Sequence, residues 1–388
     1  MNIIFFTHAA FFNSQSMPRF AQMLKSGMEE RGHSVDVWTA KSMFFKLPAP
    51  QLFKKWLGYL DQFVVFPLQV KKKLKQFNGN TIFVFTDNAL GPWVPLVSDL
   101  PHAIHCHDFL AQLSERGETP ENITGFSGKQ YQQFIRRGFV KGKNFIAVSK
   151  KTKKDLHRFL IKEPQSSHVV YNGLNQSFAL QNPANALVCF SKKININLDN
   201  GFMLHVGGNL WYKNRLGIIA IYTAWRNISK LNCNLILIGD APADDLIAAK
   251  ERSPFSSDIH FLSGISDQYV QMAYASAKVF LFPSLAEGFG WPIAEAMASG
   301  CPVITTNEAP MSEVAGSAGF LINRMPNDAE KSDAWAVESA RILETVATLS
   351  PEQRAIEINK GLENVKRFNA KESLDKIEKI YLEILAGY

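Results

Sequence analysis

The sequence predicts an α/β protein of two domains, each built on a parallel sheet covered by helices. Its 388 residues exceed the roughly 100–200 residues of one typical domain. Segments such as LILIG at 235–239 are apolar throughout, as strands buried on both faces of a parallel sheet are. They alternate with stretches such as 18–31, where apolar residues recur at helical spacing, which is the pattern of β-helix-β units.

The first half opens with a strand over 2–7, a helix over 18–31 that Gly32 ends, and a strand over 34–39. Further strands are predicted over 81–86, 102–107, 145–148, 203–206, 235–239, 260–264, 279–282 and 302–305, and 308–313 and 319–322 continue the second domain. Further helices are predicted after Ser149 or a Thr152–Asp155 capping box, from about Arg215, over 269–277 and over 371–385. The Asn-rich segment 174–200 lacks periodicity, so we expect the linker there.

Cysteine spacing and hydropathy indicate a cytoplasmic protein. The four cysteines (Cys106, Cys189, Cys233 and Cys301) show no paired spacing, which argues against disulfides and a zinc site. The N-terminal MNIIFFTHAAFF is predicted to be a buried strand and not a signal peptide, and no run approaches 18 apolar residues. We therefore expect a reducing compartment and no membrane span.

The charge is unevenly divided. Residues 1–200 hold 25 basic and 13 acidic residues, a net charge of +12, whereas residues 201–388 hold 17 and 22, a net charge of −5. This asymmetry favours contact with the inner face of the cell membrane over nucleic acid, because no nucleic-acid-binding motif accompanies the lysines.

One segment, 44–77, combines aromatic residues with lysines. Its lysines are Lys54, Lys55, Lys71, Lys72, Lys73 and Lys75, and the aromatic residues assigned to the contact are Trp56, Phe63 and Phe66. Such a segment can lie in a bilayer interface. The alternative, a pair of core helices with a solvated lysine face, stays open.

Three stretches carry candidate site residues. In HCHDF, His105 and His107 could share a metal, but no third ligand follows at suitable spacing, so no metal is expected. After the strand at 203–206 come Gly207 and Gly208, and Lys213 could reach a diphosphate at the start of the next helix.

The stretch 278–305 is the most informative. A strand leads into a loop with Gly288 and Gly290, then into a helix with Pro292 in its first turn and Gly300 at its end. A glycine-rich loop at a helix N-terminus binds anions. The carboxylates of Glu287 and Glu295 can accept hydrogen bonds from sugar hydroxyls. Together these features predict a pocket for a nucleotide that carries a sugar.

Glu287 and Glu295, in EGFGWPIAEAMASGCPVI, resemble the paired-glutamate signature of retaining GT-B glycosyltransferases, glycosyltransferase family 4. RGHSVDVWT and VVYNG at 169–173 resemble further elements of the family. The resemblance implies two Rossmann-like domains facing across a cleft. Residues 1–180 would bind the acceptor, 195–370 the donor, and a terminal helix at about 371–388 would cross back to the first domain.

The resemblance also implies roles for residues. His107, Lys213 and Glu287 would be catalytic. The donor would contact Gly207, Gly208, Asn209, Arg215, Gly264, Ile265, Gly288, Phe289, Gly290, Trp291 and Glu295. The sequence departs from the family at Gly208, where an arginine is usual, and in AAFFNSQSMPRF, which lacks the usual glycines.

The implied reaction moves a hexosyl unit from a nucleotide diphosphate sugar, such as UDP-glucose, to a glycan or lipid-linked glycan in polysaccharide biosynthesis. The configuration would be retained, without cofactor or metal, since no Asp-x-Asp triplet is present. Two alternatives stay open: a nucleotide-sugar 2-epimerase of the same fold, and a non-catalytic sugar-nucleotide-binding protein.

Overall fold

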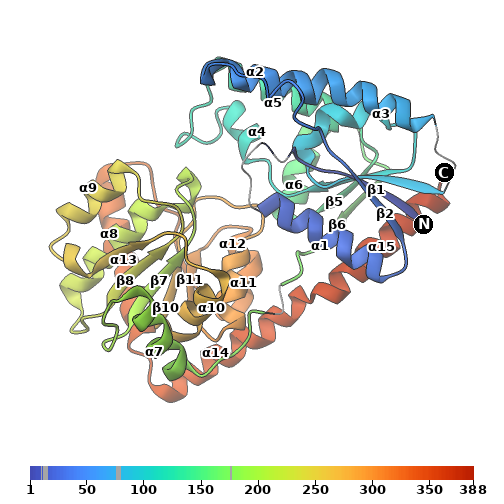
Figure 1. Ribbon diagram of the computed structural model, residues 1–388. Coiled ribbons are helices and arrows are strands. Elements are labelled where there is room, and N and C mark those ends of the chain that lie inside the picture. Colours follow the sequence, from blue (N-terminus) through green and yellow to red (C-terminus); the bar gives the residue numbers. More distant parts are fainter. Residues whose placement is uncertain (10, 12–15, 76–79, 175–176) are drawn as a thin grey trace. The chain divides into compact units, whose positions relative to one another are not determined.

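The computed structural model describes residues 1–9, 11, 16–75, 80–174 and 177–388. The chain divides into two compact units (Figure 1). Unit 1 comprises Met1–Tyr171 and Lys371–Tyr388, and unit 2 comprises Asn172–Ala370. Each unit contains a six-stranded sheet whose neighbouring strands are all parallel. The predicted α/β architecture of two parallel sheets is therefore confirmed.

The sheet of unit 1 has the strand order β2-β1-β3-β4-β5-β6. Its strands are β1 (Asn2–Phe6), β2 (Ser34–Trp38), β3 (Thr81–Phe85), β4 (His102–Cys106), β5 (Asn144–Ala147) and β6 (Ser166–Val169). The order reverses between β1 and β3. In doubly wound sheets, ligands bind at the carboxyl ends of the strands beside such a reversal.

Helices cover both faces of this sheet: α1 and α15 lie on one side, and α2, α3 and α5 on the other (Figure 1). They are α1 (Ser16–Glu30), α2 (Gln51–Leu60), the π-helical η1 (Asp61–Val65), α3 (Phe66–Leu74), the 3-10 segment η2 (Asn88–Leu96), α4 (Leu110–Glu115), α5 (Phe126–Phe139), α6 (Lys150–Phe159) and α15 (Ala370–Ala386). Ser149 caps α6, accepting a hydrogen bond from the backbone N–H of Thr152.

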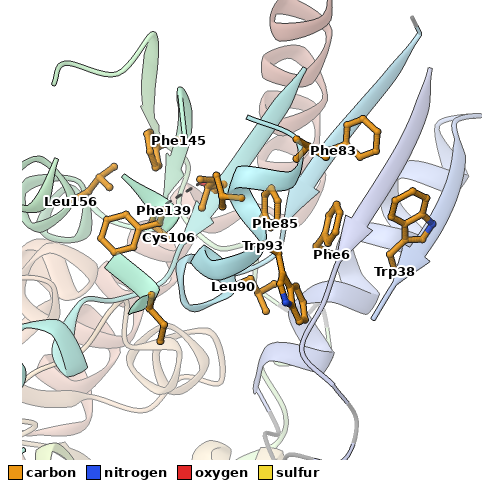
Figure 2. Close-up of a cluster of buried hydrophobic side chains, with 14 of the residues drawn as sticks. Phe6, Trp38, Phe83, Phe85, Leu90, Trp93, Cys106, Phe139, Phe145 and Leu156 are labelled. Atoms are coloured by element: carbon orange, nitrogen blue, oxygen red, sulfur yellow. Dashed lines mark hydrogen bonds between the residues drawn. The ribbon is translucent and has the colours of Figure 1, made fainter. Parts of the chain in front are cut away.

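Aromatic side chains fill the core between the sheet and α3 (Figure 2). The ring of Phe6 stacks on Phe85 with centroids 4.6 Å apart, and Phe66 lies 4.5 Å from Trp93. Phe63 packs edge-on against Phe134 at 5.2 Å. Phe63 and Phe66, which the sequence assigned to a membrane contact, are therefore occupied in packing.

The last helix, α15, packs within unit 1 although it follows unit 2 in the chain. Its apolar face is buried, and comprises Leu374, Ile377, Ile380, Tyr381 and Ile384. Polar contacts fix it as well. Arg31 Nη2 lies 2.5 Å from Asp375 Oδ1, and His105 Nε2 lies 2.6 Å from the hydroxyl of Tyr381.

The sheet of unit 2 has the order β12-β11-β10-β7-β8-β9, which reverses between β7 and β10. Its strands are β7 (Phe202–Val206), β8 (Asn234–Ile238), β9 (Ile259–Leu262), β10 (Val279–Phe282), β11 (Val303–Thr306) and β12 (Gly319–Ile322). Its helical segments are α7 (Pro183–Ile194), η3 (Trp211–Lys213), α8 (Arg215–Ile228), α9 (Asp244–Arg252), η4 (Ser256–Asp258), α10 (Asp267–Ser276), α11 (Trp291–Ala298), α12 (Met311–Ala315), η5 (Gly316–Ala318), α13 (Ala329–Ala347), α14 (Pro351–Val365) and η6 (Lys366–Phe368).

One segment differs from the prediction. The segment 174–200, where the linker was expected because the sequence lacks periodicity, contains α7, which Asn182 caps. This helix buries only Ala186 and Phe190, so its apolar face is too narrow to give a clear period. VVYNG at 169–173 begins at the last residue of β6.

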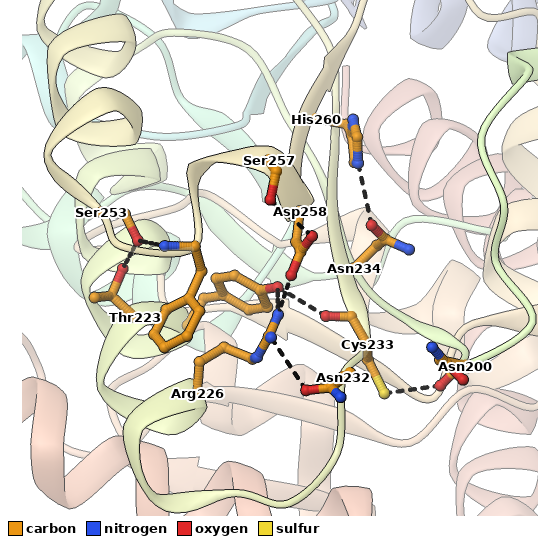
Figure 3. Close-up of polar contacts among 12 residues, drawn as sticks. Asn200, Thr223, Arg226, Asn232, Cys233, Asn234, Ser253, Ser257, Asp258 and His260 are labelled. Atoms are coloured by element: carbon orange, nitrogen blue, oxygen red, sulfur yellow. Dashed lines mark hydrogen bonds and ion pairs between the residues drawn. The ribbon is translucent and has the colours of Figure 1, made fainter.

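A polar network anchors α8 to the outer edge of its sheet (Figure 3). Arg226 forms an ion pair with Asp258 and donates a hydrogen bond to the hydroxyl of Tyr222 at 2.8 Å. That hydroxyl donates to the carbonyl of Cys233 at 2.7 Å. The network holds α8, which begins with the predicted site residue Arg215.

Candidate functional site

The loop after β7 approaches the loop after β8 so closely that side chains are excluded. A Cβ atom on Gly239 would lie 2.0 Å from the carbonyl oxygen of Gly207. A Cβ atom on Gly208 would lie 2.4 Å from Oδ2 of Asp240. A side chain at position 208 would therefore have to displace the carboxylate of Asp240.

Lys213 and Glu287, 74 residues apart in sequence, form an ion pair in unit 2. The distance between Lys213 Nζ and Glu287 Oε1 is 2.8 Å, and the two side chains are 15% and 9% exposed. The ammonium also lies 5.1 Å from the ring centre of Phe282, at the end of β10. The structure thus joins two predicted catalytic residues at the reversal point of the second sheet.

Asn214 connects the same two loops. It has a left-handed backbone (φ 52°), and its side-chain oxygen caps α8 by accepting from Gly217 N at 3.2 Å. Its amide nitrogen donates to the carbonyl of Pro283 at 2.9 Å. Asn214 therefore fixes the position of Lys213 against the loop that carries Glu287.

Arg215 is buried at the first position of α8. Its guanidinium donates to Asn209 Oδ1 and, at 3.2 Å, to the carbonyl of Asp240. Burial lowers the pKa of Arg215, and the carboxylate of Asp240 opposes that shift. Nε and Nη2 are buried without a hydrogen-bond partner among the described residues. Arg215 therefore contacts Asn209, which is also predicted to bind the sugar donor. Two of its nitrogens, Nε and Nη2, remain available to donate hydrogen bonds.

The loop 287–290 leads into α11 as predicted. Gly290 has φ +100° and stands at the N-cap of α11. Phe289 is buried, and its ring packs edge-on against Phe368 at 5.3 Å. Trp291 is the first residue of α11, and the ring centres of Trp291 and Phe289 are 6.4 Å apart. The loop is thus held by packing of its one large apolar side chain.

Glu295 lies in the second turn of α11 and is half-buried. The hydroxyl of the fully buried Tyr274, in α10, donates to Glu295 Oε2 at 3.2 Å. Burial raises the pKa of Tyr274 well above its usual value, and the neighbouring charge of Glu295 adds to this. The phenol is therefore a fixed donor that orients this carboxylate.

His205, in β7, is a buried polar residue that the sequence did not single out. Its Nδ1 donates to the carbonyl of Leu281 at 2.9 Å, which leaves Nε2 as an acceptor. Burial lowers the pKa of His205 to about 3, and the charges of Arg215 and Lys213 act in the same direction. Nε2 has no partner in the described parts of the chain, and a Cβ atom on Gly207 would lie 2.8 Å from it.

Gly264 and Ile265 follow β9. Gly264 is exposed with φ +69°, and Ile265 is half-exposed. Within the described residues, no hydrogen bond joins them to Lys213 or Glu287. Gly288, in the loop before α11, is half-buried.

In unit 1, His107 directly follows β4. It is buried, and its Nε2 donates to the carbonyl of Thr86 at 3.0 Å. Its ring meets that of Phe20 edge-on at 4.4 Å. Burial lowers the pKa of His107, although the charge of Asp87 and the Thr86 carbonyl oppose this. His107 is therefore neutral and has a fixed orientation.

A further ion pair, in unit 1, was not predicted from the sequence. His8 Nε2 lies 2.8 Å from Asp87 Oδ2, and these residues follow β1 and β3, the strands at the reversal of the first sheet. A signal existed in the parallel endings FFTH at 5–8 and VFTD at 84–87, each a buried strand followed by Thr and a titratable residue. His8, Asp87 and His107 thus follow three consecutive strands of the first sheet, β1, β3 and β4, at the carboxyl ends of these strands.

Across the described ranges, the structure contains no cluster of three or more His, Cys, Asp or Glu side chains suited to a metal ion. None of the helices described is both long and apolar enough to span a bilayer.

The sequence matches two family models, "Glycosyltransferase Family 4" over residues 17–178 and "Glycosyl transferases group 1" over residues 202–344. Among curated relatives, O-antigen chain mannosyltransferase B of Escherichia coli is 33% identical over 44% of this chain and 42% of its own length. O-antigen chain mannosyltransferase RfbU of Salmonella typhimurium is 28% identical over 55% of this chain and 56% of its own length. The chain thus spans about half the length of the curated relatives it matches.

Solved structures show the same fold. WaaG, a glycosyltransferase involved in lipopolysaccharide biosynthesis, superposes with a TM-score of 0.71 at 17% identity, over 97% of this chain and 98% of its own. HepE of Anabaena, solved with UDP and glucose, gives 0.70 at 18% identity, over 98% of each chain. Together with the family models and the paired glutamates, this match shows that the chain belongs to the GT-B glycosyltransferases of group 1, glycosyltransferase family 4.

Proposed function

We propose that the protein transfers a hexosyl unit from a nucleotide diphosphate sugar to a glycan or lipid-linked glycan during polysaccharide assembly. The Lys213–Glu287 pair at the reversal point of the second sheet carries this proposal. Relatives named as O-antigen chain mannosyltransferases support the assignment to polysaccharide assembly.

Lys213 would bind the donor diphosphate. An ammonium group has three hydrogen-bond donors, so Lys213 can keep its bond to Glu287 and still bind a phosphate oxygen. As the sugar–phosphate bond breaks, negative charge grows on the leaving diphosphate, and a fixed cation stabilises that charge. The spare guanidinium donors of Arg215 would supply the second cation in place of the usual arginine.

The two glutamates would divide the rest of the donor between them. Glu295, oriented by Tyr274, would accept hydrogen bonds from the ribose, and Glu287 would accept from hydroxyls of the transferred sugar. The backbone N–H groups of Phe289 and Gly290 would meet the diphosphate at the start of α11. We further propose roles for Gly207, Gly208 and Asn209 beside the phosphates, for Gly264 and Ile265 beside the base, and for Gly288 and Trp291 in shaping the loop.

Unit 1 would bind the acceptor. His107 would contact the sugar, and the His8–Asp87 pair would bind acceptor hydroxyls. The acceptor oxygen would attack the anomeric carbon from the face that the diphosphate leaves. The acceptor proton would pass to the departing phosphate oxygen, so the configuration is retained and no metal is needed. The protein would work at the cytoplasmic leaflet.

The donor is proposed to be a UDP-hexose such as UDP-glucose. A neighbour solved with UDP-glucose supports that choice. A mannosyl donor is the second candidate, because four relatives are named mannosyltransferases.

Calorimetry with UDP-, GDP- and ADP-sugars, followed by transfer assays with the tightest donor, tests the proposal. NMR of the product should show the anomeric configuration of the donor, and activity should survive EDTA. A donor isomer formed without acceptor would favour the 2-epimerase. Tight nucleotide binding without hydrolysis or transfer would favour a binding protein. Loss with EDTA and recovery with magnesium or manganese would overturn the metal-independent mechanism.

A further inference from the structure

A row of large apolar side chains is exposed along one helical segment of unit 1. Helices α2 and α3, joined through η1, follow one another along the outside of this unit (Figure 1). The row, which we call the apolar stripe, consists of Phe53, Trp56, Leu60, Val64 and Leu68. Its members are between 43% and 62% exposed. They recur every three or four residues, so they share one face across all three elements.

The opposite face of the segment packs into the protein. Phe66 and Val70 are buried in the core of unit 1, and Trp93 Nε1 donates to the carbonyl of Gln62 at 2.9 Å. The ring of Tyr59 stacks on Tyr131 at 5.4 Å. The segment is thus firmly seated, and exposure of the stripe does not come from a loosely attached helix.

The segment carries positive charge almost without opposition. Residues 43–75 contain seven lysines and a single acidic residue, Asp61. Asp61 is buried, and its carboxylate accepts hydrogen bonds from the backbone N–H groups of Met43, Phe44 and Phe45 at 2.9–3.1 Å. The one negative charge is therefore turned inward.

Lysines follow the stripe at its C-terminal end. Lys71 and Lys72, one turn beyond Leu68, are exposed and form no hydrogen bond or ion pair with the described residues. Apolar side chains beside exposed lysines match the acyl boundary and the anionic headgroups of a bilayer.

We propose that the apolar stripe inserts into the interface of an anionic lipid bilayer, with Lys71 and Lys72 against the headgroups. A second copy of the chain is disfavoured as the occupant, because two facing stripes would bring lysines together. This inference deepens the proposed function by giving the face that meets a lipid-linked acceptor. It rests on that function only for the identity of the acceptor.

Vesicle co-sedimentation without any donor tests it. The protein should bind vesicles of phosphatidylcholine with phosphatidylglycerol, bind pure phosphatidylcholine at least tenfold more weakly, and be released by 0.5 M salt, roughly where the Debye length falls to a few ångströms. Trp56→Ser/Leu68→Ser should lower the partition coefficient at least tenfold. The matched control, Val188→Ser/Ile228→Ser, removes two equally exposed apolar side chains from unit 2 and should leave it unchanged.

Quenching by brominated lipids gives a second readout. Tryptophan emission of the wild type should fall on brominated anionic vesicles, and Trp56→Phe should abolish most of that decrease. Equal binding to neutral vesicles, no binding, or self-association removed by the stripe variant would each overturn the inference. The variant Trp56→Ser/Leu68→Ser should transfer sugar to a water-soluble acceptor at the wild-type rate. A failure of the proposed function would appear in that assay, whereas a failure of this inference would appear only in vesicle binding.

Discussion

The hydroxyl of Tyr274 donates a hydrogen bond to Oε2 of Glu295 across 3.2 Å and so joins helix α10 to helix α11. Because the phenol is fully buried, it has no alternative solvent partner. If Glu295 binds the ribose, Glu295→Ala should weaken binding of UDP alone by about 1–3 kcal/mol, the value of a hydrogen bond to a charged group. Glu287→Ala should leave UDP affinity unchanged and lower turnover. Equal UDP affinities in calorimetry would refute this division of roles.

Tyr274 itself can be tested as a positioning residue. Tyr274→Phe removes the bond that orients Glu295, so UDP binding should weaken by about 0.5–1.5 kcal/mol, with kcat little changed. Tyr222→Phe is the matched control, because it also removes a buried phenol hydrogen bond in unit 2. That variant should lower thermal stability and leave UDP affinity as it is.

The Lys213–Glu287 pair predicts a loss of rate. Lys213→Met keeps the length of the side chain and removes its charge, so kcat should fall roughly 10²–10³-fold, as when one stabilising donor at a developing anion is lost. Glu287→Gln should cost less, because the amide still fills the site. A double-mutant cycle measured by kcat/KM should give non-additive losses. Strict additivity would show that the two side chains act separately.

Gly208 predicts a steric coupling. In Gly208→Ala the new methyl group meets Asp240 Oδ2, which also accepts a hydrogen bond from the Asn209 backbone. Because this oxygen is the end of a flexible side chain that can turn aside, the unfolding free energy should fall by no more than about 1 kcal/mol, the lower end of the usual cost of overpacking. Adding Asp240→Ala should recover part of this loss in urea denaturation. No recovery would mean that the clash is relieved elsewhere.

The His8–Asp87 pair predicts a pH dependence. Burial disfavours a charged His8, but the hydrogen bond and charge of Asp87 outweigh it and raise the pKa of His8. The folded protein thus binds the proton more tightly than the unfolded chain. The contribution of His8 to stability should be complete below about pH 6.5 and lost as the pH rises through its folded-state pKa.

The same pair behaves differently in acid. Burial disfavours a charged Asp87, yet its contacts with His8 lower the pKa of Asp87. The contribution of Asp87 to stability is therefore lost only as the pH falls below the usual carboxyl range.

Melting curves from pH 5 to 8 test the prediction for His8. The melting temperature of the wild type should decline as the pH rises, and the decline should be smaller in His8→Gln. Parallel curves for the two proteins would contradict the assignment.

Much of the fold could be predicted because the strands of a parallel sheet are buried on both faces and therefore appear in the sequence as runs of apolar residues. The strand Val279–Phe282 lies at its predicted bounds. Helix α7 was missed because it buries only two side chains. Phe63 and Phe66 were misassigned because an aromatic residue on an amphipathic segment looks the same whether it faces a bilayer or a neighbouring helix.

The site could be predicted in part. Gly290 and Glu295 are close in sequence, so the motif revealed them together. The pairing of Lys213 with Glu287 and of His8 with Asp87 depends on strand order, which brings residues 74 and 79 positions apart into contact. Single-sequence reasoning has no access to such contacts. The same limit applies to the approach of the Asp240 carboxylate to Gly208.

The position of α15 has a consequence for synthesis on the ribosome. Unit 1 needs this helix to cover Gly27, since a Cβ there would already overlap Leu374, and to provide the tyrosine hydroxyl beside His105. The first unit to emerge is therefore the last to be completed, after the whole of unit 2 has been translated. Until then the surface of unit 1 that α15 covers stays open to solvent.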